Sequence, residues 1–141
     1  MRLLVVEDNP TDVMLLQEAL RAAGNKHEPE IARDGEEAMT RLRGPDGHPD
    51  LVLLDLNLPR KNGREVLAEV KADPVLRSIP IIVLTSSGAH PDIDFAYAHH
   101  ANAYVRKPLG LERLTEFAAT LRDFWQGQVT LPFPAGGTEP A

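Results

Sequence analysis

The stretch that decides the fold is residues 51–59, which read Leu-Val-Leu-Leu-Asp-Leu-Asn-Leu-Pro. Its first four residues are all apolar, and an acid, Asp55, follows them directly. A run that is apolar at every position suits a strand buried on both faces, as in a parallel sheet covered by helices. The stretch therefore predicts a buried parallel strand with a carboxylate at its carboxyl end.

Similar runs recur along the chain and alternate with helical patterns. Asn9 and Pro10 are typical of a helix start with Asn as the N-cap, Asp12 adds an acid to the first turn, and Gly24 with Asn25 ends that helix. The alternation favours an α/β fold with a doubly wound, five-stranded parallel sheet in the order 2-1-3-4-5 and helices on both faces. The predicted strands are residues 3–6, 28–32, 51–54, 81–84 and 103–105, and the other predicted helices are residues 35–43, 63–72, 91–99 and 111–125.

Composition limits the classes to which the chain can belong. Its 141 residues match about one domain, and 43% apolar with 26% charged residues are typical of a globular chain with one core. The net charge of −6, without a basic tract, disfavours binding to nucleic acid or to a membrane surface. The absence of cysteine excludes disulfides and thiolate sites, and no apolar run approaches the ~20 residues that cross a bilayer.

These limits predict a soluble, cytoplasmic protein with one domain. We expect that domain to span residues 1–126. Residues 127–141 are rich in Pro and Gly, so we expect a partly disordered tail there and no output domain.

Polar residues follow four of the predicted strands at the point where each strand ends. Glu7 and Asp8 follow the first strand, Asp55 the third, Thr85 the fourth and Lys107 the fifth. In an open α/β sheet, ligands bind outside the carboxyl ends of the strands, near the point where the strand order reverses. We therefore expect these five side chains to converge in one crevice.

The chemistry of this set favours phosphoryl transfer. Carboxylates that lie close together repel one another unless a cation joins them, and oxygen ligands without nearby His or Cys suit Mg²⁺ better than zinc. Lys107 supplies a positive charge and Thr85 a hydroxyl donor for phosphate oxygens. Each residue alone has an ordinary explanation, such as acids before a helix N-terminus, a β-forming Thr or a solvated Lys. Together they indicate a site with a carboxylate nucleophile.

As an ordered set, these residues resemble the receiver domain of two-component response regulators, from residue 1 to about residue 125. The resemblance implies a flavodoxin-like fold and a phosphorelay switch that catalyses only its own phosphoryl transfer and autodephosphorylation. It implies that Asp55 accepts the phosphoryl group from a sensor histidine kinase or a phosphotransfer protein. The motifs that carry the resemblance are those at Glu7-Asp8-Asn9, Asp55 to Pro59, Gly63, Thr85-Ser86 and Tyr104 to Pro108.

The resemblance also implies a metal site. Glu7, Asp8, Asp55 and the backbone carbonyl of Asn57 would hold Mg²⁺, for which Mn²⁺ or Ca²⁺ can substitute. Lys107 would contact the phosphoryl oxygens.

Three further expectations concern the backbone and the switch. The peptide bond between Lys107 and Pro108 would be cis. Thr85 would move toward the phosphoryl group, and Tyr104 would turn inward behind it. These two residues would thus form the conformational switch.

Two helix faces are candidates for partner binding. In the first helix, Met14 and Leu15 are expected to point away from the core, which predicts a kinase-docking patch of Thr11, Met14, Leu15 and Glu18. In the last helix, Phe117 and Phe124 lie on the shoulder of the apolar stripe formed by residues 111, 114, 118, 121 and 125. This excess apolar surface favours a homodimer through the fourth helix, fifth strand and fifth helix. Residues 97–105 and 124–132 also resemble small regulators that are paired with bacterial phytochrome kinases.

Other readings fit less well. A haloacid-dehalogenase-like phosphatase would carry Asp-x-Asp after its first strand, whereas here the acid pair comes first and Asn57 replaces the second acid of that motif. A receiver fold that only docks and is never phosphorylated would usually lack one of the acids, the Lys or the Thr. A nucleotide- or flavin-binding domain would need a Gly-rich loop where Glu7 to Pro10 stand.

Overall fold

The computed structural model describes residues 1–132 and contains a parallel sheet in the order β2-β1-β3-β4-β5. The predicted fold class and strand order are confirmed. The strands are β1 (Leu3–Val6), β2 (Glu30–Ala32), β3 (Leu51–Leu54), β4 (Ile81–Thr85) and β5 (Ala103–Arg106). The helices are α1 (Pro10–Ala22), α2 (Gly35–Arg43), α3 (Gly63–Ala72), α4 (His90–Ala98) and α5 (Leu111–Gly127). The predicted disorder at the end of the tail falls outside the described residues.

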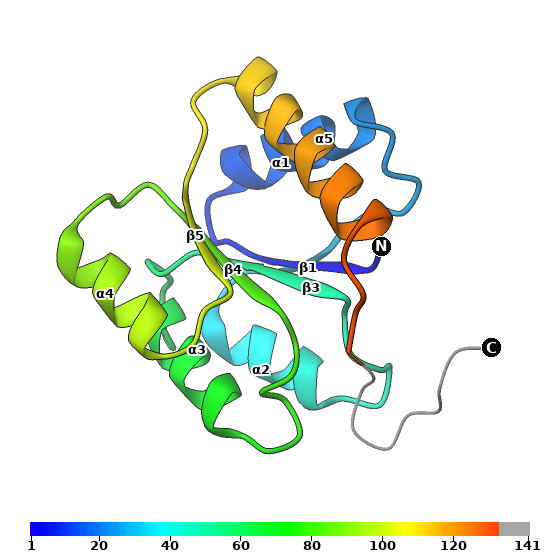
Figure 1. The fold of residues 1–141 in the computed structure, drawn as a ribbon. Helices are drawn as coiled ribbons and strands as arrows, with labels where there is room; N and C mark the ends of the chain where they lie inside the picture. Colours follow the sequence, from blue (N-terminus) through cyan, green and yellow to red (C-terminus); the bar gives the residue numbers. More distant parts are fainter. Residues whose placement is uncertain (133–141) are drawn as a thin grey trace.

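Helices cover both faces of the sheet (Figure 1). Alternate side chains of a strand point to opposite faces, so Leu51 and Leu53 pack toward α1 and α5, and Val52 and Leu54 pack toward α2, α3 and α4. The other central strands divide their residues in the same way. Two cores on one sheet explain why these strands are apolar at every position.

Local sequence signals set most of the element boundaries. Asn9 caps α1, because its side-chain oxygen accepts hydrogen bonds from the N–H groups of Thr11 at 2.9 Å and Asp12 at 3.2 Å. Strand β2 begins two residues later than predicted, immediately after Pro29, which has no N–H to donate to a ladder. Helix α4 begins and ends one residue earlier than predicted, and α5 continues two residues further.

The buried face of α1 is wider than predicted. Val13, Leu16 and Leu20 are buried as expected, and Met14 is exposed. Leu15, expected to point away from the core, is half-buried against the α1–α5 core. The reason is that α1 packs against both the sheet and α5, so two of its faces are buried.

The apolar stripe of α5 is only partly buried. Its central residues Leu114, Ala118 and Leu121 are buried. Leu111, predicted to share that stripe, is largely exposed because it is the first residue of the helix, and Phe124 is exposed near the other end. Thus burial is concentrated in the middle of α5, which lies beside α1 (Figure 1).

The described part of the tail returns toward the sheet. Residues 129 and 131 are half-buried, and Pro132 lies beside His48, Pro49 and Pro80, which belong to the loops before β3 and β4. Among residues 1–132, no helix is both long and apolar enough to span a membrane.

One glycine fixes the start of α3 against the end of β3. The N–H of Gly63 donates to the carbonyl oxygen of Leu56 at 3.1 Å, and a Cβ at position 63 would overlap the carbonyl oxygen of Asp55. We predict that Gly63→Ala lowers the free energy of unfolding by about 2 kcal/mol or more in urea denaturation. The reason is that the backbone of Asp55 and Leu56 would have to move to make room for the new methyl group. Gly127→Ala is the matched control, since a Cβ there meets nothing within 4 Å. Equal effects of the two substitutions would contradict this packing argument.

Candidate functional site

Five polar side chains meet at the carboxyl edge of the sheet, as the sequence predicted. Asp55 lies at the centre and is largely buried. Its Oδ1 accepts a hydrogen bond from the hydroxyl of Thr85 at 2.9 Å and one from the N–H of Asn57 at 3.1 Å. Its Oδ2 accepts one from Nζ of Lys107 at 3.0 Å. Asp55 is thus held on one oxygen by neutral donors and on the other by a charged donor.

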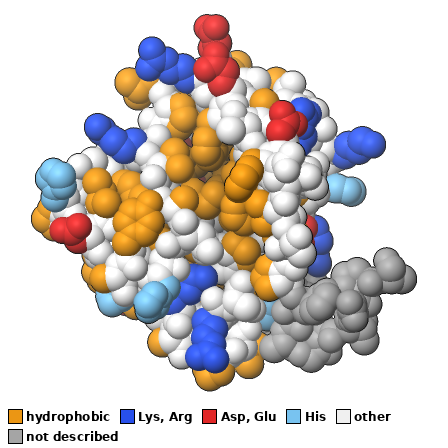
Figure 2. All heavy atoms as spheres, viewed as in Figure 1, with side chains coloured by type: hydrophobic (Ala, Val, Ile, Leu, Met, Phe, Trp, Pro, Cys, Tyr) orange, Lys and Arg blue, Asp and Glu red, His pale blue; other side chains and the backbone are white. Residues whose placement is uncertain are grey.

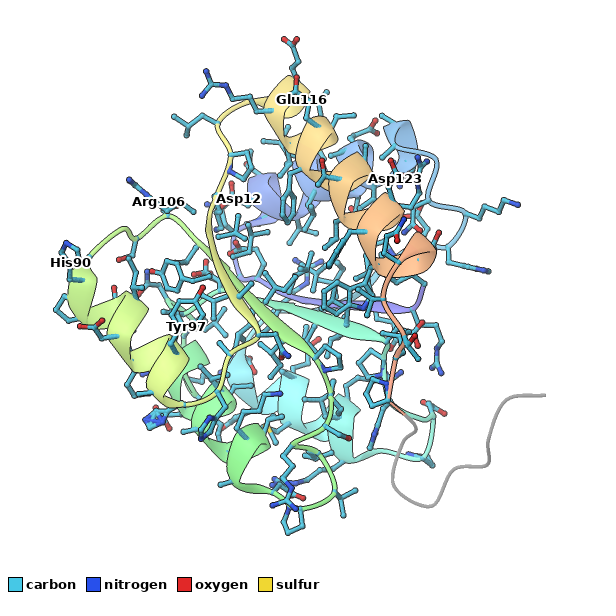
Figure 3. The ribbon with its side chains drawn as sticks, viewed as in Figure 1. Asp12, His90, Tyr97, Arg106, Glu116 and Asp123 are labelled. Atoms are coloured by element: carbon cyan, nitrogen blue, oxygen red, sulfur yellow. The ribbon has the colours of Figure 1, made fainter. Side chains whose placement is uncertain are left out.

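Lys107 joins carboxylates from three segments of the chain. Besides Asp55, its Nζ contacts Oε1 of Glu7 and lies 2.9 Å from Oδ2 of Asp12. Asp12 stands in the first turn of α1 and faces β5 (Figure 3). From the sequence, Asp12 was expected only to be an acid in the first turn of a helix. Its position one turn after the capping Asn9 was the available signal, since the start of α1 lies at the carboxyl edge of the sheet.

The pKa values of Glu7 and Lys107 are both raised, which favours the neutral form of Glu7 and the charged form of Lys107. Burial raises the pKa of the Glu7 carboxyl to about 7, although hydrogen bonds from Lys107 and Asn9 oppose this. Burial by itself would lower the pKa of Lys107, but its hydrogen bonds to Glu7, Asp12 and Asp55 outweigh burial and raise it. Lys107 therefore stays charged near neutrality, while Glu7 exchanges its proton there.

Three of these acids also fit a divalent metal ion. Glu7, Asp8 and Asp55 each offer an oxygen, and these atoms lie within 4.8 Å of one another. Asp8 is exposed and Glu7 and Asp55 are buried, so the group is open to solvent on one side. Oxygen donors of this kind, with one open side, suit Mg²⁺ or Mn²⁺, which keep several waters.

A cavity of about 210 Å³ adjoins Asp55. Its charged end is formed by Glu7, Asp12, Asp55 and Lys107, and its walls are mostly apolar residues from β1, β3, β4, α1 and the start of α5. The carboxylate therefore faces an open, partly apolar space that can admit a small reactive group.

The family model of the response regulator receiver domain matches residues 3–119. The chain belongs to the response regulator receiver family. The predicted family is thus confirmed, and the site described above occupies the matched region. Receivers of this family are signalling switches.

Known relatives are similar over nearly the whole chain. The response regulator Rcp1 of Synechocystis is 43% identical over 135 residues, which is 92% of each chain. The crystal structure of the phosphorylated cyanobacterial phytochrome response regulator RcpA matches with a TM-score of 0.85 and 45% identity, covering 93% of this chain and 97% of that one. The Mn²⁺-bound form of Rcp1 matches with a TM-score of 0.82 and 43% identity, covering 92% of this chain and 97% of that one.

The two expected switch residues of this receiver already point inward. Thr85 is fully buried and donates to Asp55. Tyr104 is half-buried, and its hydroxyl donates to the carbonyl oxygen of Ser87 at 2.7 Å. The Tyr104 N–H donates to the hydroxyl of Tyr97, which reaches β5 from α4 at 3.1 Å (Figure 3). Both side chains therefore lie in the arrangement that the resemblance implies for the phosphorylated receiver.

One expectation drawn from the resemblance is wrong. The structure has no cis peptide bond among residues 1–132, so the bond between Lys107 and Pro108, expected to be cis, is trans. Trans is the lower-energy isomer of an X–Pro bond by roughly 0.5–1 kcal/mol. Lys107 reaches all three of its carboxylate partners with this trans bond, so the contacts of the site do not require the cis isomer.

The raised pKa of Glu7 predicts a pH-dependent stability. The folded receiver keeps a proton on Glu7 between pH 4.5 and 7, whereas the unfolded chain has released it, so this group's contribution to the free energy of unfolding falls as the pH rises through that window. In buffer with a chelator, we expect a loss of roughly 1–2 kcal/mol between pH 5 and pH 7 in urea denaturation, relative to Glu7→Gln. A constant difference between the two proteins over this range would contradict the assignment.

Proposed function

We propose that this receiver is a phosphorelay response regulator that accepts a phosphoryl group onto Asp55 from a sensor histidine kinase or a phosphotransfer protein. The observation that supports this most directly is the environment of Asp55. One carboxylate oxygen lies 2.9 Å from the Thr85 hydroxyl and the other 3.0 Å from the Lys107 ammonium, beside an open cavity. A carboxylate in this position can accept a phosphoryl group, because the ammonium and the hydroxyl beside it can stabilise the negative oxygens of that group.

The residues around Asp55 have distinct parts in the transfer. A carboxylate oxygen of Asp55 would form the new bond to phosphorus as the bond to the donor histidine nitrogen breaks. Lys107 and the Thr85 hydroxyl would then donate to phosphoryl oxygens. This is a reaction of the receiver on itself, followed by autodephosphorylation, and not turnover of a separate substrate.

Mg²⁺ would be held by Glu7, Asp8, Asp55 and the backbone carbonyl of Asn57. The acid cluster and the Mn²⁺-bound structure of the relative Rcp1 support a divalent ion. When bound, the ion neutralises the charge of the acids and of the incoming phosphoryl oxygens. Glu7 must lose its proton to act as a ligand, so we expect metal binding to strengthen as the pH rises toward 7 and above.

The inward positions of Thr85 and Tyr104 support a switch that works by shifting a population. A phosphoryl group would stabilise the inward arrangement of Thr85 and Tyr104 through its contacts with Thr85 and Lys107. A full reversal from 1:99 to 99:1 requires about 5.5 kcal/mol of differential binding, more than one hydroxyl hydrogen bond contributes. Lys107 would therefore share the work with Thr85.

The kinase would dock on α1 and would belong to the bacterial phytochrome class. The exposed Met14 lies in the expected docking patch with Thr11, Leu15 and Glu18, and Leu15 also lines the cavity beside Asp55. The phytochrome assignment is supported by the 45% identity to RcpA, which is a phytochrome response regulator. Such an encounter would place the receiver in the cytoplasm.

A homodimer is the second proposed contact. Figure 2 shows apolar side chains gathered at the centre of the face that carries α4, β5 and α5. Tyr97 of α4 and Phe124 of α5 are both more than half exposed, and Phe117 is half-buried. A second copy of the chain would cover this surface in an isologous interface.

Phosphorylation can be tested by intact mass after incubation with acetyl phosphate and Mg²⁺. We expect the receiver to gain one phosphoryl group, because the Asp55 carboxylate lies next to a cation and a hydroxyl donor and lines an open cavity. We expect no gain for Asp55→Asn, and none for the wild type with a chelator.

Asp94→Asn is the matched control, since it removes an exposed acid from α4 and should be labelled like the wild type. Labelling of Asp55→Asn would contradict the acceptor assignment. If the wild type gains no mass and its NMR spectrum does not change when beryllofluoride is added, a receiver that only docks and is never phosphorylated would be favoured. An autophosphorylated bacterial phytochrome kinase, used as donor in place of acetyl phosphate, tests the partner class with the same readout.

The dimer face can be tested by sedimentation velocity. We expect Phe124→Asp to shift the receiver to monomer, because a buried, unpaired carboxylate would stand in the interface. Met14→Asp is a matched control: Met14 is 55% exposed and Phe124 56%, but Met14 lies on α1. A dimer that survives Phe124→Asp and dissociates with Met14→Asp would move the interface to α1.

A further inference from the structure

Helix α4 is weakly anchored by its own packing. Of its nine residues only Ala96 is fully buried, whereas α3 buries four. Its N-cap is Ala89, whose side chain makes no capping hydrogen bond, whereas Asn62 caps α3. A helix with so little buried surface and no side-chain cap needs another contact to fix its position.

One such contact, besides the hydrogen bond between Tyr97 and Tyr104, is an ion pair between α3 and α4. Oδ1 of Asp92, in the first turn of α4, accepts from Nη2 of Arg64 on α3. Both side chains are shielded from water, with exposed fractions of 32% for Arg64 and 19% for Asp92. The pair holds the pKa of the Asp92 carboxyl below its usual value, together with a hydrogen bond from Ser87. A partly buried pair with a third partner is stronger than an exposed one.

Asp92 also fixes the loop that leads into α4. Its Oδ2 accepts a hydrogen bond from the hydroxyl of Ser87 at 2.6 Å, and that hydroxyl oxygen accepts one from the N–H of Ala89 at 3.2 Å. The carbonyl oxygen of the same Ser87 accepts the hydroxyl of Tyr104 at 2.7 Å. The acceptor to which Tyr104 binds is therefore held in place by Asp92.

Arg64 connects this group of contacts to the acceptor strand. Its Nη1 lies 3.5 Å from the carbonyl oxygen of Leu56, the residue after Asp55. Two routes thus run from Asp55 to Tyr104. One passes through the Thr85 hydroxyl and along the chain to Ser87, and the other passes through Arg64 and Asp92.

We propose that Arg64 and Asp92 form a positioning pair, which we call the α3–α4 latch, that holds α4 and Ser87 where Tyr104 lies inward. The latch biases the switch through Ser87, the residue that accepts the Tyr104 hydroxyl, and not through the Thr85 hydroxyl. Breaking it releases Ser87 and the start of α4, so the outward state of Tyr104 gains population without any change at Asp55. The bearing of the latch on signalling rests on the proposed function, but its effect on α4 and Tyr104 does not.

The test compares Asp92→Asn and Arg64→Gln with Asp94→Asn in the full chain. Asp94 is an exposed acid on the same helix, so its substitution makes the same charge change as Asp92→Asn without touching the latch. The first readout is amide hydrogen exchange of α4 and residues 86–89. We expect exchange to be about threefold to tenfold faster in both latch variants and unchanged in the control. Amides of α1 serve as the internal standard for intact folding.

The second readout is ¹⁹F NMR of the receiver labelled with 3-fluorotyrosine, which has two signals because the chain has two tyrosines. Tyr97→Phe assigns them. We expect the latch variants to shift or split the Tyr104 signal, and beryllofluoride with Mg²⁺ to restore it. The change in the Tyr104 signal should be no larger in the double variant than in either single variant, because both substitutions break the same contact. Arg64→Lys keeps the positive charge, so it should retain most of the wild-type Tyr104 signal.

Latch variants that match Asp94→Asn in both exchange and ¹⁹F signal would overturn the proposal. So would equal acceleration of exchange in α1, which would show general destabilisation. Labelling by acetyl phosphate separates the two claims. A wild type that is not labelled and whose ¹⁹F spectrum does not change with beryllofluoride would contradict the proposed function, whereas the exchange comparison of the latch variants would still decide whether the latch exists.

Discussion

The contact on which the site depends is the ammonium of Lys107 held among the carboxylates of Glu7, Asp12 and Asp55. These acids come from the end of β1, the start of α1 and the end of β3, so folding itself brings like charges together at one edge of the sheet. Without a cation, their repulsion and desolvation would oppose the sheet order that creates the site. Lys107, delivered by β5, offsets this cost.

The same arrangement leaves the site short of positive charge. One ammonium faces three carboxylates, and Asp8 adds a further acid at the rim. Burial and the nearby Asp55 carboxylate raise the pKa of Glu7 to about 7, so Glu7 keeps its proton below that pH. A divalent ion would complete the balance, and its site would also receive the oxygens of a phosphoryl group. The electrostatics of this crevice thus favour the binding of a divalent cation.

Sequence reasoning predicted the parts of the site that are tied to strand ends. Glu7, Asp55, Thr85 and Lys107 each follow a buried run, and the carboxyl ends of parallel strands share one edge. Asp12 was missed as a site residue because it stands within a helix, where position along the strand gives no information. Arg64 and Asp92 were missed because they are 28 residues apart on two helices, and only the packing of α3 beside α4 brings them together.

Errors in detail have physical causes of the same kind. Leu15 was expected to be exposed from helical periodicity, which describes one covered face, but α1 is covered by both the sheet and α5. The cis bond at Pro108 was transferred from a resemblance, whereas the trans isomer satisfies every contact of Lys107. The sequence by itself determined the fold class, the strand order and the edge at which the chemistry lies, because burial on both faces and the residues at strand ends are local patterns. Only the tertiary structure decided which charges touch and how α4 is held, because those contacts join segments whose spacing along the chain carries no signal.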